Sequence, residues 1–436
     1  FYEKIILRKS DGENYDLSSI KLSLMSLLIA AIKDDNTELV QELLSRPADQ
    51  VDVNVVQDGK TPLFIACSNG NPDIVLLLLS RPEIKVNLLS TRVTKEKGKR
   101  EEMTALHVAC EKENYQIVRL LLERNDIDVN ARSIKHSKNK TKENTALIIA
   151  IKTENVQIIR LLLSRDEIDV NIKQTKRSKD KEEEISPLQI AIKESNLDIV
   201  QYLLTRPNID TNSKYIRKIK GKTKELSALH LAVQRGNVKI VRNLIDMPEM
   251  DVNMKAIKES KDKYKEKTAL TMATKEEHVE IVRLILCRYE IDCNIKYLKQ
   301  SKDKRIELTA LHIATQKQNL DIVMSLLEQP RIDVNIFSIH KEIDKTKIAS
   351  FREDHFTALH LAVLADNAEI VLFLLARPST DANLKSYQKE NDKIKQKTAL
   401  HLAVEKDFKD VVENLLYDKR VDKNITDEKG KKAIQL

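Results

Sequence analysis

Apolar residues fall in two kinds of short block that alternate along almost the whole chain. In the segment 227–253, the first block is the mainly apolar run 229–233, closed by Gly236, whose free backbone suits the left-handed residue at a helix end. The second block, 238–245, has apolar residues at helical spacing, and Pro248 prevents its continuation. The pattern predicts two short antiparallel helices joined by a tight turn.

This two-helix unit is repeated, because the tetrapeptide Thr-Ala-Leu-His and its relatives return mostly 41 residues apart. Ten copies open at Ser26, Thr61, Thr104, Thr145, Ser186, Ser227, Thr268, Thr309, Thr357 and Thr398. A fixed period of this length is typical of a repeat array, in which each unit buries its apolar face only against its neighbours. We expect an array over 26–424, a flank or partial cap at 1–25, and the start of a truncated further repeat at 425–436.

The unit at 227–253 carries four short motifs. They are Ser-Ala-Leu-His at its start, Gly-Asn between the helices, Ile-Val-x-x-Leu-Ile in the second helix and Asp-Val-Asn at its end. In these motifs the chain resembles the ankyrin-repeat family. The resemblance implies an all-α repeat solenoid of stacked helix-turn-helix units, which binds proteins through the concave face of its first helices and its fingers. The closing asparagines, of which Asn253 is one, are expected to form a ladder between repeats.

The connections between units, here called fingers, are longer than in the family, whose repeats have about 33 residues. Seven of the eight extra residues lie between the closing Asn and the next opening Thr or Ser. The enlarged fingers are 88–102, 131–144, 172–185, 213–226, 254–267, 295–308, 336–356 and 384–397. Extended flanks around a polar tip, such as Ser-Lys-Asp-Lys at 301–304, predict β-hairpins. Disordered loops are the alternative, because lysine-rich segments bury little apolar surface to offset the entropy of ordering.

The net charge of +8 conceals a separation of charge along the chain. The eight fingers contain 41 Lys and Arg against 20 Asp and Glu, so they carry +21 and the remainder must carry −13. This separation predicts a row of basic hairpins on an acidic solenoid, which would attract a long negative surface. The alternative is that lysines only protect exposed hairpin edges from aggregation.

One finger, 336–356, departs from this rule, because it is the longest and carries no net charge. Its apolar residues are Phe337, Ile339, Ile343, Ile348, Phe351 and Phe356. In the next repeat, Leu364 and Ala365 occupy two positions where other repeats have mainly polar residues. We interpret this junction as a specific apolar docking site, since a hydrophobic cluster on a polar surface usually has a partner. The alternative is that the insert folds back upon itself.

Candidate catalytic and metal-binding residues form no recurring constellation. Five histidines occupy the fourth position of the opening motif and are interpreted as structural: His107, His230, His312, His360 and His401. No Ser, Cys or carboxylate accompanies them at the spacing of a triad or a metal site, and no glycine-rich phosphate loop is present. Cys67 and Cys110 share one small core position, whereas Cys287 and Cys293 lack paired zinc spacing. We expect no enzymatic activity, no cofactor and no metal.

The compartment and the ends of the protein are predicted from simpler features. The longest uncharged apolar stretch, 22–32, is shorter than the ~18 residues that a membrane span requires. The chain starts without a secretory signal, and its cysteines suit a reducing compartment, which predicts a cytoplasmic protein. The first residue is not Met, and residues 430–436 look like the opening of another repeat, so we expect both ends to be cut from something longer.

The function that these features favour is a non-enzymatic scaffold or adaptor that binds an acidic protein surface. A microtubule, with its acidic tails, would match a row of basic fingers and would imply association with the cytoskeleton. The candidate partner-binding residues are Lys218, Lys220, Lys222, Lys261, Lys263, Lys302, Lys304, Tyr215, Tyr297, Phe337, Phe351 and Leu364. One alternative is binding of nucleic acid or an acidic membrane by the same fingers, with stacking on Tyr215, Tyr264, Tyr297 and Tyr387. The excess of Lys over Arg and the few aromatic residues argue against nucleic acid, and a rigid spacer is the other alternative.

Overall fold

Pairs of short antiparallel helices recur along the protein, one pair for each repeat. The computed structural model describes residues 17–93, 98–344 and 350–435, in two compact units that divide between residues 179 and 180. The helices of the first unit are α2 (Leu17–Lys33), α3 (Thr37–Leu44), α4 (Pro62–Asn69), α5 (Pro72–Leu79), α6 (Ala105–Glu111), α7 (Tyr115–Leu122), α8 (Ala146–Lys152) and α9 (Val156–Leu163). Those of the second unit are α10 (Pro187–Lys193), α11 (Leu197–Leu204), α12 (Ala228–Arg235), α13 (Val238–Ile245), α14 (Ala269–Lys275), α15 (Val279–Leu286), α16 (Ala310–Gln316), α17 (Leu320–Leu327), α18 (Ala358–Leu364), α19 (Ala368–Ala376), α20 (Ala399–Glu405), α21 (Lys409–Tyr417) and the 3-10 helix η2 (Ala433–Gln435).

Hydrogen bonds at the helix starts explain why the opening motif recurs. In the repeat that opens at Thr309, the threonine hydroxyl lies 2.6 Å from Nδ1 of His312. Nε2 of the same ring lies 3.1 Å from the carbonyl oxygen of Phe356, at the base of the next finger. The second helix begins after Asn319, whose Oδ1 accepts a hydrogen bond from the backbone N–H of Ile322 at 3.2 Å. The histidine therefore joins the start of a helix to the base of a finger.

The hydrophobic core lies between the helices of each unit. In α13, Ile240, Val241 and Leu244 are fully buried, and α13 packs on α12 of its own repeat and on α15 of the next. Burial of one such side chain contributes about 1.5–3 kcal/mol, which is enough to fix the spacing of the repeats. That spacing in turn sets the distance between the bases of successive fingers.

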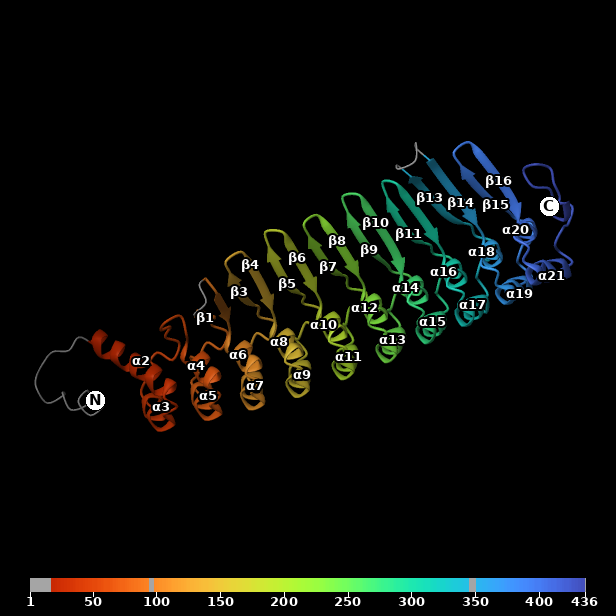
Figure 1. Ribbon diagram of the computed structural model, residues 1–436. Helices are drawn as coiled ribbons and strands as arrows, with labels where there is room; N and C mark the ends of the chain where they lie inside the picture. Colours follow the sequence, from red (N-terminus) through yellow and green to blue (C-terminus); the bar gives the residue numbers. More distant parts are fainter. Residues whose placement is uncertain (1–16, 94–97, 345–349, 436) are drawn as a thin grey trace, which may run out of the picture. The chain divides into compact units, whose positions relative to one another are not determined.

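The fingers form antiparallel hairpins, which confirms the hairpin prediction over the disordered loop and makes the all-α description incomplete. The strands of the first unit are β1 (Ser90–Val93), β2 (Arg100–Met103), β3 (Ser133–Ser137), β4 (Lys140–Asn144) and β5 (Gln174–Ser178). Those of the second unit are β6 (Lys181–Ile185), β7 (Tyr215–Ile219), β8 (Lys222–Leu226), β9 (Lys255–Ser260), β10 (Lys263–Thr268), β11 (Tyr297–Ser301), β12 (Lys304–Leu308), β13 (Ser338–Asp344), β14 (Ser350–Phe356), β15 (Lys385–Glu390) and β16 (Lys393–Thr398). Neighbouring hairpins also pair with each other, as β8 with β9 and β10 with β11. Within the second unit the fingers therefore build one sheet beside the first helices of the repeats (Figure 1).

The closing asparagines form the expected ladder between repeats. Nδ2 of Asn253 donates to the carbonyl oxygen of Glu290 at 2.8 Å, and its Oδ1 accepts from the backbone N–H of Asp292 at 2.9 Å. Asn294 makes the same two contacts with the repeat that follows, through Arg331 and Asp333. Each of these two asparagines therefore satisfies backbone groups of the next repeat.

Both ends of the described chain carry regular structure. Helix α2 starts at Leu17, nine residues before the opening Ser26 of its repeat. Beyond Asn424, Thr426 pairs with Lys432 and is followed by η2. The boundaries of the flank at 1–25 and of the partial repeat at 425–436 stay predictions.

Candidate functional site

The finger sheet of the second unit has two faces, because alternate residues along a strand point to opposite sides. Tyr215 of β7 and Tyr297 of β11 define one face, and both rings are buried. The Nζ atoms of Lys193 and Lys275, at the ends of α10 and α14, lie 5.4 and 5.2 Å from the centroids of these rings. This face therefore lies toward the ends of the first helices, and we call it the inner face. The opposite side is the outer face.

The register of the strands aligns five basic residues on the inner face. We call them the inner row: Arg217, Lys224, Lys258, Lys265 and Lys299. Each member lies directly opposite the next in the neighbouring strand, from β7 to β11. Because neighbouring strands are about 4.8 Å apart, the inner row is about 19 Å long.

Acidic side chains do not balance the inner row in the described part of the chain, where none of its members forms an ion pair with a carboxylate. Burial lowers the pKa of the Lys224 ammonium, and the facing charges of Lys258 and Arg217 lower it further. Burial also lowers the pKa of Lys265, with Lys299 as the next cause. Like charges held directly opposite each other destabilise a sheet. The inner row therefore concentrates positive charge at a cost to the fold.

Two side chains mark the limits of the inner row. Glu183 lies opposite Arg217, but it already accepts a hydrogen bond from the Tyr215 hydroxyl at 3.2 Å and pairs with Lys181 at 3.0 Å. Toward the helices, burial lowers the pKa of Lys267 to about 8. The Lys267 ammonium therefore adds positive charge at neutral pH and loses its proton more readily than an ordinary lysine.

The outer face is neutralised by an ion pair that recurs in three consecutive hairpins, β7–β8, β9–β10 and β11–β12. A lysine at the base of the first strand contacts a glutamate near the end of the second strand. These pairs are Lys214–Glu225 at 3.0 Å, Lys255–Glu266, and Lys296–Glu307 at 3.4 Å. Surface pairs of this kind, here with partly buried glutamates, add only about 0.2–1 kcal/mol each, but they cancel the charge of the lysines that they involve. Away from the hairpin turns, the unbalanced charge of these fingers lies on the inner face.

Removing one charge from the inner row should stabilise the protein. We expect Lys265→Gln to raise the free energy of unfolding by up to about 1 kcal/mol in low-salt buffer, because it removes a like charge that faces two others. Denaturant unfolding checks this value, and high salt should reduce the gain. Lys261→Gln, in the turn of the same hairpin, is the matched control. An equal gain for the two variants would contradict the assignment.

The structure places the predicted lysines at several positions. Those in hairpin turns are Lys220, Lys261 and Lys302, and those on the inner face between the inner row and the turns are Lys222, Lys263 and Lys304. Lys304 pairs with Glu342 at 3.1 Å, and Lys218, on the outer face, pairs with Glu182 at 3.0 Å. Tyr215 and Tyr297 are only 4% and 7% exposed, so neither ring is available to stack on a ligand.

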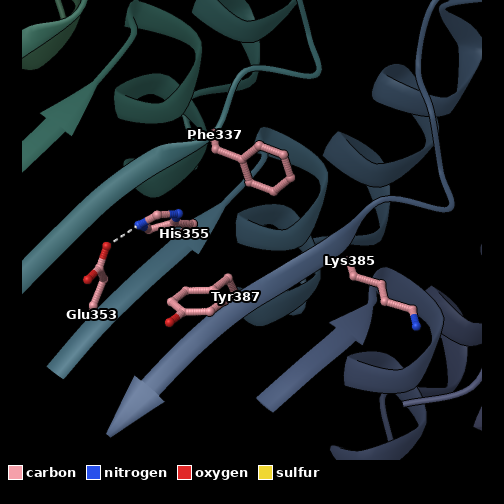
Figure 2. A pocket seen from close by; sticks show the side chains of 5 residues that line it. All are labelled: Phe337, Glu353, His355, Lys385 and Tyr387. Atoms are coloured by element: carbon pink, nitrogen blue, oxygen red, sulfur yellow. Dashed lines mark hydrogen bonds and ion pairs between the residues drawn. The ribbon is translucent and has the colours of Figure 1, made fainter. Parts of the chain in front are cut away.

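The uncharged finger 336–356 interrupts the ion pairs of the outer face. Phe337 and His355 stand where the other hairpins have the paired lysine and glutamate. Together with Tyr387, Glu353 and Lys385 they line a shallow pocket of about 310 Å³ (Figure 2). The ring centroids of His355 and Tyr387 are 5.2 Å apart, and Nε2 of His355 lies 2.7 Å from Oε1 of Glu353.

The other residues of the predicted apolar junction lie in different places. Phe351 is on the outer face, with Nζ of Lys389 at 5.8 Å from its ring centroid. Phe356 is buried and lies near His360, with ring centroids 6.3 Å apart. Leu364 ends α18 at the repeat position of Lys193 and Lys275, on the inner side of the sheet. Leu364 and Phe351 therefore do not share one surface, and Ile348 lies outside the described residues.

Comparison with known proteins agrees with this arrangement of helix pairs. The family model described as "Ankyrin repeats (3 copies)" matches residues 6–90, 27–133, 87–174, 132–215, 214–297, 258–338, 294–386 and 339–427. The chain belongs to the ankyrin-repeat family. Among solved structures, the ankyrin repeat domain of Bcl-3, a member of the IkappaB protein family, is 25% identical over 59% of this chain and 97% of that one, with a TM-score of 0.43. No curated protein matches the chain.

The inner row of this ankyrin array was not predicted from the sequence, although a signal for it exists. Lysines alternate with other residues at Lys222 and Lys224, and again at Lys263, Lys265 and Lys267. In a strand, this period of two places them on one face. What the sequence does not contain is the register between one hairpin and the next, which brings the alternating lysines into a single row.

Metal sites and membrane spans are both absent from the described ranges of the chain. These residues contain no cluster of three or more His, Cys, Asp or Glu side chains that could hold a metal ion. Their helices also include none that is long and apolar enough to cross a membrane. Three cysteines, Cys67, Cys110 and Cys293, are buried, and Cys287 is exposed.

Proposed function

We propose that the chain is a protein-interaction scaffold whose inner row binds an acidic segment of a partner protein. Ankyrin repeats are generally protein-interaction modules, and the fold alone does not name the partner. The single observation that carries the proposal is a line of five facing basic residues that no carboxylate of the described residues pairs with. Because this arrangement destabilises the sheet, a negative ligand that neutralises it recovers free energy on binding.

The dimensions of the inner row suit a polypeptide. An extended segment advances about 3.3 Å per residue, so about six residues cover the 19 Å of the row. Ammonium groups on flexible lysine side chains can pair with carboxylates in several geometries. The row also lies toward the ends of the first helices, on the side where the family resemblance implies binding.

Nucleic acid is a poorer ligand for this surface than an acidic polypeptide. Single strands bind where bases stack on exposed aromatic rings. On the inner face, Tyr215 and Tyr297 are buried beneath Lys193 and Lys275. Tyr264 and Tyr387 belong to the outer face, away from the inner row.

A titration with matched probes tests the proposal. We expect fluorescein-labelled octaglutamate to bind the chain at low salt at least about tenfold more tightly than octauridylate of similar charge, a difference of ~1.4 kcal/mol. Octaglutamine should not bind, and the affinity for octaglutamate should fall as salt rises. Fluorescence anisotropy measures all three. Equal or tighter binding of octauridylate would instead assign the inner row to nucleic acid. If octaglutamate did not bind at all, the inner row would not be a binding site for acidic peptides.

The titration identifies the chemistry of the ligand but not the partner protein itself. Polymerised tubulin is one acidic assembly that a row of basic fingers would match, and a cytoplasmic, cytoskeleton-associated location goes with that candidate. Co-sedimentation with microtubules, before and after proteolytic removal of their acidic tails, tests it directly. Loss of binding on removal of the tails is the result that this candidate requires.

A further inference from the structure

A second surface of this chain lacks the ion pair that recurs on the outer face of the preceding hairpins. On the outer face, the positions of the Lys–Glu ion pair are occupied by Phe337 and His355 in one hairpin, and by Lys385 and Gln396 in the next. Between them, Tyr387 stands where β7, β9 and β11 have Ile216, Ile257 and Leu298. Two consecutive hairpins therefore lose the ion pair, and three rings meet there.

The walls of this pocket are mainly apolar, and the carboxylate of Glu353 at its edge already binds two side chains of the protein. Figure 2 shows the rings of Phe337, His355 and Tyr387 grouped around the pocket, with Glu353 beside His355. Lys341 contacts Glu353 at 2.7 Å from the other side. Burial acts to raise the pKa of the Glu353 carboxyl, but the hydrogen bonds from Lys341 and His355 hold it below its ordinary value. Glu353 is therefore ionised and neutralised by protein groups, and it is not available to bind a cation.

The remaining charge at the pocket is positive. Lys385 is exposed at the rim, and its ammonium points away from the three rings (Figure 2). At the equivalent position of three other hairpins the lysine pairs with a glutamate, but here the partner position holds Gln396. Within the described ranges, Lys385 has no ion pair. The pocket thus combines an apolar floor with an unpaired cation at its edge.

We propose that this pocket binds a peptide segment of a partner protein in which an apolar side chain stands beside an acidic one. The apolar side chain enters between Phe337, His355 and Tyr387, and the carboxylate reaches Lys385. A volume of about 310 Å³ is small for a complete ligand, but it is sufficient for one anchoring side chain. The site lies on the outer face and does not depend on the inner row.

The carboxylate belongs to an acidic side chain and not to the end of a polypeptide. Proteins that capture a terminal carboxylate use unpaired backbone N–H groups. Here β13, β14 and β15 are hydrogen-bonded to one another across the floor of the pocket. The ammonium of Lys385 is the donor that a side-chain carboxylate meets.

The test uses a substitution that copies the other hairpins. Phe337→Lys with His355→Glu restores the ion pair seen at Lys214–Glu225, so this variant should fold as the native chain does. The probe is the tetrapeptide acetyl-Gly-Leu-Asp-Gly-amide, followed by saturation-transfer NMR at its leucine methyl groups. We expect transfer from the native chain and none from the restored variant. The Asn analogue of the peptide should bind about threefold more weakly, as expected for loss of an exposed ion pair.

Two further variants locate the transfer at the pocket. Lys258→Gln with Lys265→Gln removes charge from the inner row and should leave transfer to the tetrapeptide unchanged. Tyr387→Ile replaces the tyrosine by the residue type that other hairpins have at this position. It serves as the second test if the variant with the restored ion pair does not fold. Absence of transfer from the native chain, or equal transfer from the restored variant or from Tyr387→Ile, would overturn the proposal.

Discussion

Acidification from pH 6.5 to pH 4.5 is expected to destabilise the ankyrin array strongly, through its buried histidines. Burial lowers the pKa of four of them from 6.5 to about 4: His107, His230, His312 and His360. Between these two values the unfolded chain binds more protons than the folded chain, so stability falls as the pH falls. Each pKa unit corresponds to 1.36 kcal/mol, so a shift of this size can cost up to about 3 kcal/mol per histidine. Urea unfolding followed by circular dichroism at pH 7, 5.5 and 4.5 measures the effect.

The chain supplies its own control for this prediction. In the repeat that opens at Ser186, the histidine position holds Gln189, whose Nε2 donates to the carbonyl oxygen of Ser213 at 2.5 Å and whose Oε1 accepts from the backbone N–H of Ser186 at 3.0 Å. Glutamine therefore makes the same connections without titrating. Replacing the four histidines by glutamine should remove most of the loss between pH 6.5 and pH 4.5. An unchanged loss would assign it to carboxylates instead.

The helices and hairpins could be predicted because their signals are local. The apolar run 229–233 and the spacing in 238–245 correspond to the buried faces of α12 and α13. The polar Ser-Lys-Asp-Lys tip at 301–304 corresponds to the turn between β11 and β12. The asparagine ladder also followed from sequence, since each closing Asn repeats one local geometry.

The candidate site could be predicted only in part because it depends on pairing between fingers. The sequence indicated basic fingers, but their lysines lie in the turns, as Lys261 and Lys302 do, as well as in the strands, so composition alone does not single out one face. Lys258 and Lys265 face each other across one hairpin, whereas Lys224 and Lys299 join them through contacts with neighbouring hairpins. The spacing of the repeats sets that second register, and no local motif encodes it.

The two faces of the finger sheet distribute charge in a way that protection against aggregation alone does not require. Lysines that merely blunt an exposed edge need no preferred face. Here the lysines of the outer face are paired with glutamates, as in Lys214–Glu225, whereas those of the inner row face one another. A destabilising arrangement confined to one face is typical of binding sites, where stability is given up for function.

Reversing two charges of the inner row is expected to weaken binding of octaglutamate by about 30- to 100-fold. The change is Lys258→Glu with Lys265→Glu. Each substitution removes one attraction and adds one repulsion, together ~1–1.4 kcal/mol per site at low salt, and each 1.4 kcal/mol is a factor of ten in the dissociation constant. The salt dependence of binding should become shallower, because fewer charges face the ligand. Fluorescence anisotropy over a series of salt concentrations gives both quantities.

The matched control changes the net charge equally but leaves the inner row intact. Lys261→Glu with Lys302→Glu places one reversed charge in the turn of the same hairpin and the other in the turn of the next hairpin. Since turn lysines act only at longer range through water, we expect a loss of no more than about threefold. A loss as large as that of the inner-row variant would show that the ligand responds to the total charge of the fingers. A loss confined to Lys258 and Lys265 would locate the ligand on the inner face.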